Sequence, residues 1–212
     1  MPDTAPFGRG RLRRRFGLDR STPPPPSTRK GEPLHPWTIP NFVGYVRLAL
    51  LPVFLVLAYG TEDGTSVLSA MVFWVIAAGD YLDGFLARAT GQYSRLGALL
   101  DPLIDRLTIL AGAVVCWNFE LLPRWALALL ALREVAMLFL AQYGLRHGVD
   151  IEVNWPGRIS VFPIMGGIFL ALLAPGWVAT ALLIWGLVMA IVATALYARA
   201  GLRAVSGAKA AS

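Results

Sequence analysis

The sequence has very little cysteine and very little charge. Cys116 is the only cysteine among 212 residues, which excludes an intramolecular disulfide, and its apolar surroundings favour a packing or lipid-facing role. Charged residues make up 15% of the chain, hydrophobic residues make up 56%, and the mean hydropathy is +0.59. This composition is too apolar for an ordinary soluble domain and predicts an integral membrane protein.

Residues 1–36 lack the apolar runs that fill the rest of the chain. They hold eight of the 19 basic residues and the proline run from Pro23 to Pro26. No apolar core follows the arginines before these prolines, so a cleavable signal peptide is not expected. We expect a disordered cytoplasmic tail that determines topology or binds anionic lipid headgroups. We expect no nucleic-acid binding, because no aromatic platform accompanies the arginines.

Six apolar segments follow, each near the ~20 residues that a bilayer core requires. We therefore expect an all-α, polytopic membrane domain at residues 37–200 with six transmembrane helices, followed by a short cytoplasmic tail at residues 201–212. The predicted helices run from Phe42 to Tyr59, Ser66 to Ala87, Ala98 to Trp117, Trp125 to Tyr143, Ile159 to Leu173 and Trp177 to Tyr197.

The charges flanking these segments predict their orientation. With the basic tail in the cytoplasm, most of the remaining basic residues fall on or near the same side, whereas the opposite loops hold Glu62, Asp63, Glu120 and Arg124. Both termini are then cytoplasmic, in a multi-pass protein of the cell membrane.

The stretch from Asp80 to Asp105 places four aspartates among apolar residues. Asp80 and Asp83 are three residues apart, and Asp101 and Asp105 are four apart, so each pair lies on one face of a helix. The small and polar residues between the pairs suit a tight connection between antiparallel helices. The four carboxylates are therefore predicted to converge at one depth.

Converging carboxylates repel one another strongly in a low-dielectric setting, so a cation must hold them. The stretch offers only oxygen ligands, without His or Cys, and this favours hard divalent cations. Two ions sharing these ligands suit in-line displacement at phosphorus. A structural ion-pair cluster with Arg88, Arg95 and Arg106 is the alternative.

The same stretch resembles the signature of the CDP-alcohol phosphatidyltransferases. The pattern D-x-x-D-G-x-x-A-R-x8-G-x3-D-x3-D is matched without a gap by Asp80, Asp83, Gly84, Ala87, Arg88, Gly97, Asp101 and Asp105. The resemblance implies transfer of a phosphatidyl group from CDP-diacylglycerol to a small or lipid alcohol, with release of CMP. It also implies two Mg²⁺ or Mn²⁺ ions, a site facing the cytoplasm among membrane lipids, and a homodimer.

The resemblance also implies roles for single residues. Asp80 and Asp101 would bridge both ions, Asp83 would complete one, and Asp105 would complete the other and act as the catalytic base. In members of the family, the residues at the positions of Gly84, Arg88 and Ser94 hold the CDP moiety.

The first predicted helix carries two further candidates. Its P-N-x-x-x-x-x-R pattern is similar to the beginning of the first helix in many members of the family, which favours CDP-diacylglycerol binding by Asn41. A helix N-cap is the alternative for Asn41. Arg47 either snorkels to lipid headgroups or faces the cavity.

Two arginines are candidates for binding the acceptor. Arg133 and its neighbour Glu134 lie in the middle of the fourth predicted helix, where ionisable residues are usually functional. Neighbours do not share a helix face, so we expect each to find its own partner across the bundle. Arg133 would clamp an anionic acceptor, or else pair with an aspartate of the cluster. Arg158 would help to bind the acceptor at the start of the fifth predicted helix. Members similar to phosphatidylglycerophosphate synthase and cardiolipin synthase more usually carry lysine at this position.

These arginines favour a phosphorylated acceptor, with glycerol 3-phosphate ranked first and phosphatidylglycerol, which yields cardiolipin, second. Inositol or inositol phosphate stays open because the stretch P-N-F-V-G-Y-V-R is similar to the first helix of eukaryotic phosphatidylinositol synthases. A divalent-cation transporter is the alternative from another class. Neither broken helices nor repeated halves, which transporters often show, are evident in the sequence.

Overall fold

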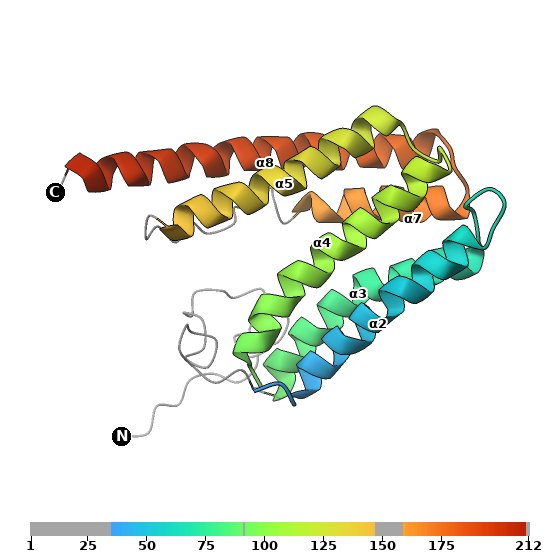
Figure 1. The fold of residues 1–212 in the computed structure, drawn as a ribbon, viewed down its shortest axis with the longest axis horizontal. Helices are drawn as coiled ribbons and strands as arrows, with labels where there is room; N and C mark the ends of the chain where they lie inside the picture. The colour runs from blue at the N-terminus through green and yellow to red at the C-terminus, as the bar shows by residue number, and fades with distance from the viewer. Residues whose placement is uncertain (1–34, 91, 147–158, 211–212) are drawn as a thin grey trace, which may run out of the picture. The chain divides into compact units, whose positions relative to one another are not determined.

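The computed structural model describes residues 35–90, 92–146 and 159–210. Within these ranges the regular elements are six helices, and no strand is present, so the predicted all-α fold is confirmed (Figure 1). Most of the basic tail, and Arg158 with the loop before it, lie outside the described residues. The helices are α2 (Ile39–Tyr59), α3 (Val67–Thr90), α4 (Arg95–Asn118), α5 (Arg124–Arg146), α7 (Val161–Leu173) and α8 (Trp177–Ala210).

Three of these helices contain segments long enough and apolar enough to cross a membrane, namely Ile39–Tyr59, Val67–Ala87 and Trp177–Leu196. No more than 33% of each apolar window is buried within the protein. The remaining surface presents large apolar side chains such as Val56 and Trp185, as lipid-facing helices do. The length, composition and exposed apolar side chains of these helices indicate that the chain is a membrane protein.

The other three helices depart from a simple membrane span. Ionisable residues interrupt α4 at Asp101 and Asp105 and interrupt α5 at Arg133 and Glu134. Helix α7 has 13 residues, and at 1.5 Å per residue it covers about 20 Å of the roughly 30 Å of a bilayer core. Helix α8 has 34 residues and continues past the predicted end of the last span, through Arg199 and Arg203. Six membrane crossings therefore stay a prediction.

The described residues form two compact units. The first comprises residues 35–53, 74–90 and 92–108, and the second comprises residues 54–73, 109–146 and 159–210. Helices α2, α3 and α4 each contribute a segment to both units. All four aspartates of the predicted site belong to the first unit.

In the first unit, hydroxyl groups cap the starts of two helices. Thr38 Oγ1 accepts a hydrogen bond from the Asn41 backbone N–H at 3.4 Å, and Ser94 Oγ accepts one from Gly97 N–H at 2.9 Å. Both contacts span three residues, as N-caps do. Thr38 therefore caps α2, and the interpretation of Asn41 as the N-cap is wrong because Asn41 lies inside the first turn.

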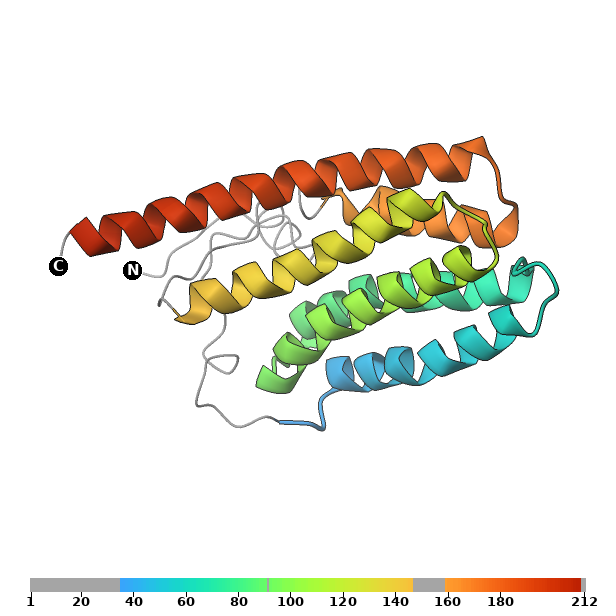
Figure 2. The same ribbon diagram turned by 45° about the horizontal axis from the view of Figure 1, so that its top comes forward.

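In the second unit, α8 packs against α7 and α5. Helices α7 and α8 lie side by side and run in opposite directions (Figures 1 and 2). A Cβ on Gly167 would lie 2.8 Å from the Leu183 backbone nitrogen and 2.9 Å from the Ala179 carbonyl oxygen. The two backbones therefore approach closely at a glycine, as small residues allow in membrane helices.

Candidate active site

A buried arginine gathers the carboxylates of the first unit. Arg47 on α2 is 2% exposed, and its Nη1 lies 3.0 Å from Asp83 Oδ2 and 3.6 Å from Asp80 Oδ1, both on α3. Its Nη2 donates a hydrogen bond of 2.6 Å to Asp105 Oδ1 on α4. The aspartate pairs of the two helices therefore converge as expected. Arg47 faces these carboxylates, which decides between its two sequence-based interpretations.

Main-chain groups hold the same arginine in place. Arg47 Nε donates a hydrogen bond of 2.9 Å to the Ile76 carbonyl oxygen on α3. A Cβ on Gly79 would lie 2.7 Å from Arg47 Cδ and 2.9 Å from its Cγ. The side-chain stem of Arg47 therefore runs against α3 where Gly79 leaves room, directly before Asp80.

The carboxylates differ in their access to the surroundings. Asp83 is 3% exposed, Asp105 is 31% exposed and Asp80 is 47% exposed, so the cluster opens on the side of Asp80. Asp101 is partly buried, and its charge interacts with those of Asp80, Asp105 and Arg47. Arg47 contributes one positive charge to this group of four carboxylates. In an apolar setting the remaining negative charge calls for further cations.

The donor set of this cluster fits a hard divalent cation, because every acidic ligand is a carboxylate oxygen. Among the residues that the structure describes, no three Asp, Glu, His or Cys side chains are arranged as a ready-made metal site. Arg47 lies among these acids, and the ion-pair cluster with Arg88, Arg95 and Arg106 stays the alternative. The metal roles of Asp80, Asp83, Asp101 and Asp105 therefore stay predictions that ligand chemistry supports.

Two residues predicted to bind CDP are hydrogen-bonded to each other. Ser94 Oγ donates to Asn41 Oδ1 at 2.7 Å, and Asn41 Nδ2 donates to the carbonyl oxygens of His35 and Pro36 at 3.0 and 3.1 Å. Both side chains are buried. A Cβ on Gly97 would lie 2.7 Å from Asn41 Oδ1, so this glycine makes room for the asparagine. The link joins the start of α2 to the start of α4, the helix that carries Asp101 and Asp105.

The other two CDP candidates lie on α3. Gly84 is half-buried and directly follows Asp83. Arg88 lies one turn further along the same helix, and its side chain is outside the described residues. Contact of these four residues with CDP stays a prediction.

The acceptor candidate Arg133 belongs to the second unit. Its Nη1 donates a hydrogen bond to Glu134 Oε1, and its Nε lies 3.3 Å from Thr194 Oγ1 on α8. The arginine and glutamate side chains are 13% and 4% exposed. Arg133 therefore has a partner across the bundle on α8, as expected. It also pairs with its neighbour Glu134, which was not expected, because both side chains are long enough to bend together along the helix surface.

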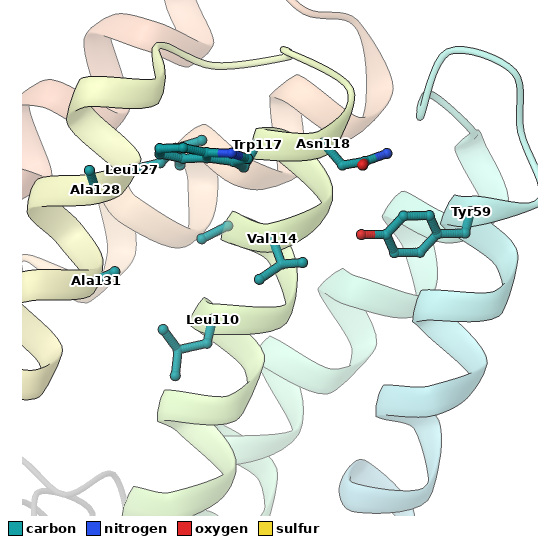
Figure 3. A pocket seen from close by; sticks show the side chains of 9 residues that line it. Tyr59, Leu110, Val114, Trp117, Asn118, Leu127, Ala128 and Ala131 are labelled. Atoms are coloured by element: carbon teal, nitrogen blue, oxygen red, sulfur yellow. The ribbon is translucent and has the colours of Figure 1, made fainter.

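An apolar pocket of about 460 Å³ also lies in the second unit (Figure 3). Tyr59 and Asn118 supply polar groups to its lining (Figure 3). The pocket shares no residue with the carboxylate cluster. Its lining consists of Tyr59, Leu110, Ala113, Val114, Trp117, Asn118, Leu127, Ala128 and Ala131.

The residue that the sequence left undecided is the one that organises the site. Arg47 is a single cation inside an otherwise apolar helix of 21 residues, and this isolation was the available signal. Its partners are 36 and 58 residues away in sequence, so spacing alone does not reveal them.

Comparison with known proteins places the site in context. The family model described as CDP-alcohol phosphatidyltransferase matches residues 37–192. The chain is 39% identical over 171 residues to the cardiolipin synthase (CMP-forming) of Streptomyces coelicolor, which covers 77% of this chain and 79% of that protein. It is 31% identical over 134 residues to the CDP-diacylglycerol–glycerol-3-phosphate 3-phosphatidyltransferase of Salmonella paratyphi A, covering 58% and 70%. The protein of that name from Bacillus subtilis is 25% identical over 138 residues, covering 59% and 72%.

Proposed function

Because the chain belongs to the CDP-alcohol phosphatidyltransferase family, we propose that it transfers a phosphatidyl group from CDP-diacylglycerol to an alcohol, releasing CMP. One observation carries the proposal within this chain. Carboxylates from α3 and α4 gather around a buried arginine, inside the segment that the family model covers. Such a cluster provides the surplus negative charge that a cation-dependent phosphoryl site requires.

The residues support an in-line reaction. Members of the family generally use divalent cations, and here the four aspartates would hold two Mg²⁺ or Mn²⁺ ions that neutralise the pyrophosphate and the departing CMP oxygen. The acceptor hydroxyl oxygen forms a bond to the lipid-side phosphorus, and the bond from that phosphorus to the CMP oxygen breaks. Asp105 takes the hydroxyl proton, since it is the more exposed of the two carboxylates that Arg47 contacts most closely.

The nucleotide would bind beside the carboxylates. Arg88 suits a phosphate group because a guanidinium binds its oxygens in a fork. Gly84 permits close approach next to Asp83. The Asn41–Ser94 hydrogen bond supports the position of α4, so these two residues would shape the nucleotide site.

We place the site at the cytoplasmic face of a multi-pass protein with both termini in the cytoplasm. The charge asymmetry of the loops supports this orientation. A water-soluble nucleotide headgroup on a lipid substrate also requires access from an aqueous compartment. A homodimer is proposed on the family resemblance alone, and light scattering of the purified protein tests it.

The proposed acceptor is phosphatidylglycerol, which gives cardiolipin. The support is the 39% identity to a cardiolipin synthase over 77% of the chain. The preference for glycerol 3-phosphate depended on Arg133 and Arg158, and Arg133 instead pairs with Glu134 and Thr194. Glycerol 3-phosphate is the second candidate because relatives at 31% and 25% identity carry that activity in their names.

The test is CMP release from CDP-diacylglycerol by purified protein in detergent, with Mg²⁺, Mn²⁺ or chelator, and with each acceptor supplied separately. We expect ion-dependent release with phosphatidylglycerol, which Asp105→Asn abolishes. Glu120→Gln, at a carboxylate that is 70% exposed, serves as the control and retains activity. Cation flux into proteoliposomes without CMP release would instead support a transporter.

A further inference from the structure

Arg47 makes two kinds of contact in the first unit. Its terminal nitrogens contact the carboxylates of Asp83 and Asp105, at 3.0 and 2.6 Å. Its Nε contacts the Ile76 carbonyl, and its stem lies against Gly79. A counter-ion that merely fills a vacant cation position needs only the first kind of contact.

We infer that Arg47 is a permanent cation of the site, which Gly79 admits against α3, and that it stays in place when divalent ions bind and positions Asp83 and Asp105 as ligands. This inference rests on the proposed function, because it assigns a role toward the ions of that reaction. Arg47 acts through the carboxylates that it contacts, Asp83 and Asp105, and is therefore a positioning residue.

Burial argues that the arginine remains in place. Arg47 is 2% exposed. Movement of its side chain out of the cluster would break the hydrogen bond from its Nε to the Ile76 carbonyl oxygen and would leave a buried guanidinium without its present partners. The guanidinium is always charged, so it cannot adapt by losing its proton.

The contacts leave ligand atoms for metal ions. Arg47 contacts Asp83 through Oδ2 and Asp105 through Oδ1, so each carboxylate has a second oxygen that this arginine does not use. The fork of the guanidinium fixes the spacing between the two carboxylates, which come from different helices. Groups that orient metal ligands in this way commonly control affinity.

Gly79 provides the sharpest test, because its substitution changes no charge. A Cβ there would lie 2.7 Å from Arg47 Cδ and 3.2 Å from its Nε. Gly79→Ala therefore displaces the arginine while keeping every ionisable group. Arg47→Lys keeps the charge and removes the fork. Gly166→Ala is the matched control, because its Cβ would meet only Leu182 Cδ1 at 3.9 Å.

The experiment measures Mn²⁺ binding to the full chain in detergent by electron paramagnetic resonance, together with thermal unfolding in chelator. We expect Gly79→Ala and Arg47→Lys to weaken Mn²⁺ binding by about 10- to 100-fold, the range typical of groups that orient metal ligands. Both variants should also melt at lower temperature in chelator. Gly166→Ala should match the wild type in Mn²⁺ affinity.

The outcomes separate this inference from its premise. Tighter Mn²⁺ binding by Gly79→Ala would show that Arg47 competes with the ions, and unchanged affinity with a lower melting temperature would show a purely structural arginine; either result overturns the inference.

Wild-type protein that binds no Mn²⁺ overturns both the metal assignment and the inference. Wild-type protein that binds Mn²⁺ without releasing CMP overturns the proposed function, while weakened binding in the variants would still support the role of Arg47. If Arg47→Lys does not fold, Gly79→Ala alone decides.

Discussion

Each of the two units holds a largely shielded arginine, and the two arginines have different kinds of partners. Arg47 in the first unit contacts carboxylates that lie 36 and 58 residues further along the chain, on two other helices. Arg133 in the second unit pairs with the next residue, Glu134, and reaches Thr194 on α8. The first arginine therefore links three helices, whereas the second is balanced mainly within its own helix.

Charge balance separates the two arrangements further. Arg133 and Glu134 form a neutral pair, so the pair itself attracts no additional ion. Arg47 faces a group of acids that one guanidinium cannot neutralise. The acidic partners of Arg47 outnumber it, which favours a cation site at the carboxylates, whereas Arg133 has one acidic partner in Glu134.

The largest difference between the units should appear on removing one carboxylate from each. We expect Asp101→Asn to reduce CMP release by on the order of 10²- to 10³-fold or more, because it removes a proposed metal ligand, and the developing charge would lose the stabilisation that the ion provides. Glu134→Gln should reduce activity far less at a temperature where both variants stay folded. The assay is CMP release, with gel filtration to confirm folding. Equal losses in both variants would contradict the distinction.

The second prediction concerns stability in the second unit. Arg133→Met removes the arginine that pairs with the buried Glu134 carboxylate and should lower the free energy of unfolding by about 3 to 5 kcal/mol. The double variant Arg133→Met/Glu134→Leu should recover most of that loss, since the buried carboxylate is removed together with the arginine. Chemical unfolding in detergent, followed by circular dichroism, measures both variants. A double variant as unstable as the single one would show that the pair has a role beyond mutual neutralisation.

Sequence reasoning succeeded where the information is local. The spacing of Asp80 and Asp83, and of Asp101 and Asp105, predicted two facing pairs because helix periodicity fixes which residues share a face. It left Arg47 undecided, since a long cationic side chain in an apolar helix either snorkels or turns inward. Arg47 can turn inward because Gly79, 32 residues later in the sequence, has no side chain to block it. No periodic pattern in the sequence connects these two positions.

Local reasoning failed for Arg133 and Glu134 for a related reason. The periodicity rule describes the directions of Cβ atoms, whereas the paired atoms lie at the ends of long, flexible side chains. The helix α8 was also predicted to end near Tyr197, where hydropathy falls, although the helical backbone continues to Ala210. Hydropathy reports the membrane boundary and does not define where a helix ends.

A third prediction compares two helix caps. Ser94→Ala removes both the cap on Gly97 N–H and the donor to Asn41 Oδ1, so we expect a loss of about 2 to 3 kcal/mol. Ser66→Ala in the second unit removes the hydroxyl that accepts from Leu68 and Ser69 N–H, and should cost about 1 kcal/mol. Thermal unfolding of the two variants measures the difference. Equal losses would mean that the Asn41–Ser94 link contributes nothing to stability.

The last prediction compares a glycine that faces a backbone with one that faces a side chain. Gly167→Ala meets the Leu183 nitrogen and the Ala179 carbonyl, which cannot move without separating α7 from α8, so it should cost about 1 to 3 kcal/mol. Gly166→Ala meets only a leucine methyl group at 3.9 Å and should be nearly neutral. Thermal unfolding measures both, and equal effects would contradict close backbone packing at Gly167. Mn²⁺ affinity should remain unchanged in Gly167→Ala, because its clash involves only packing within the second unit, whereas the clash at Gly79 moves a charge among carboxylates.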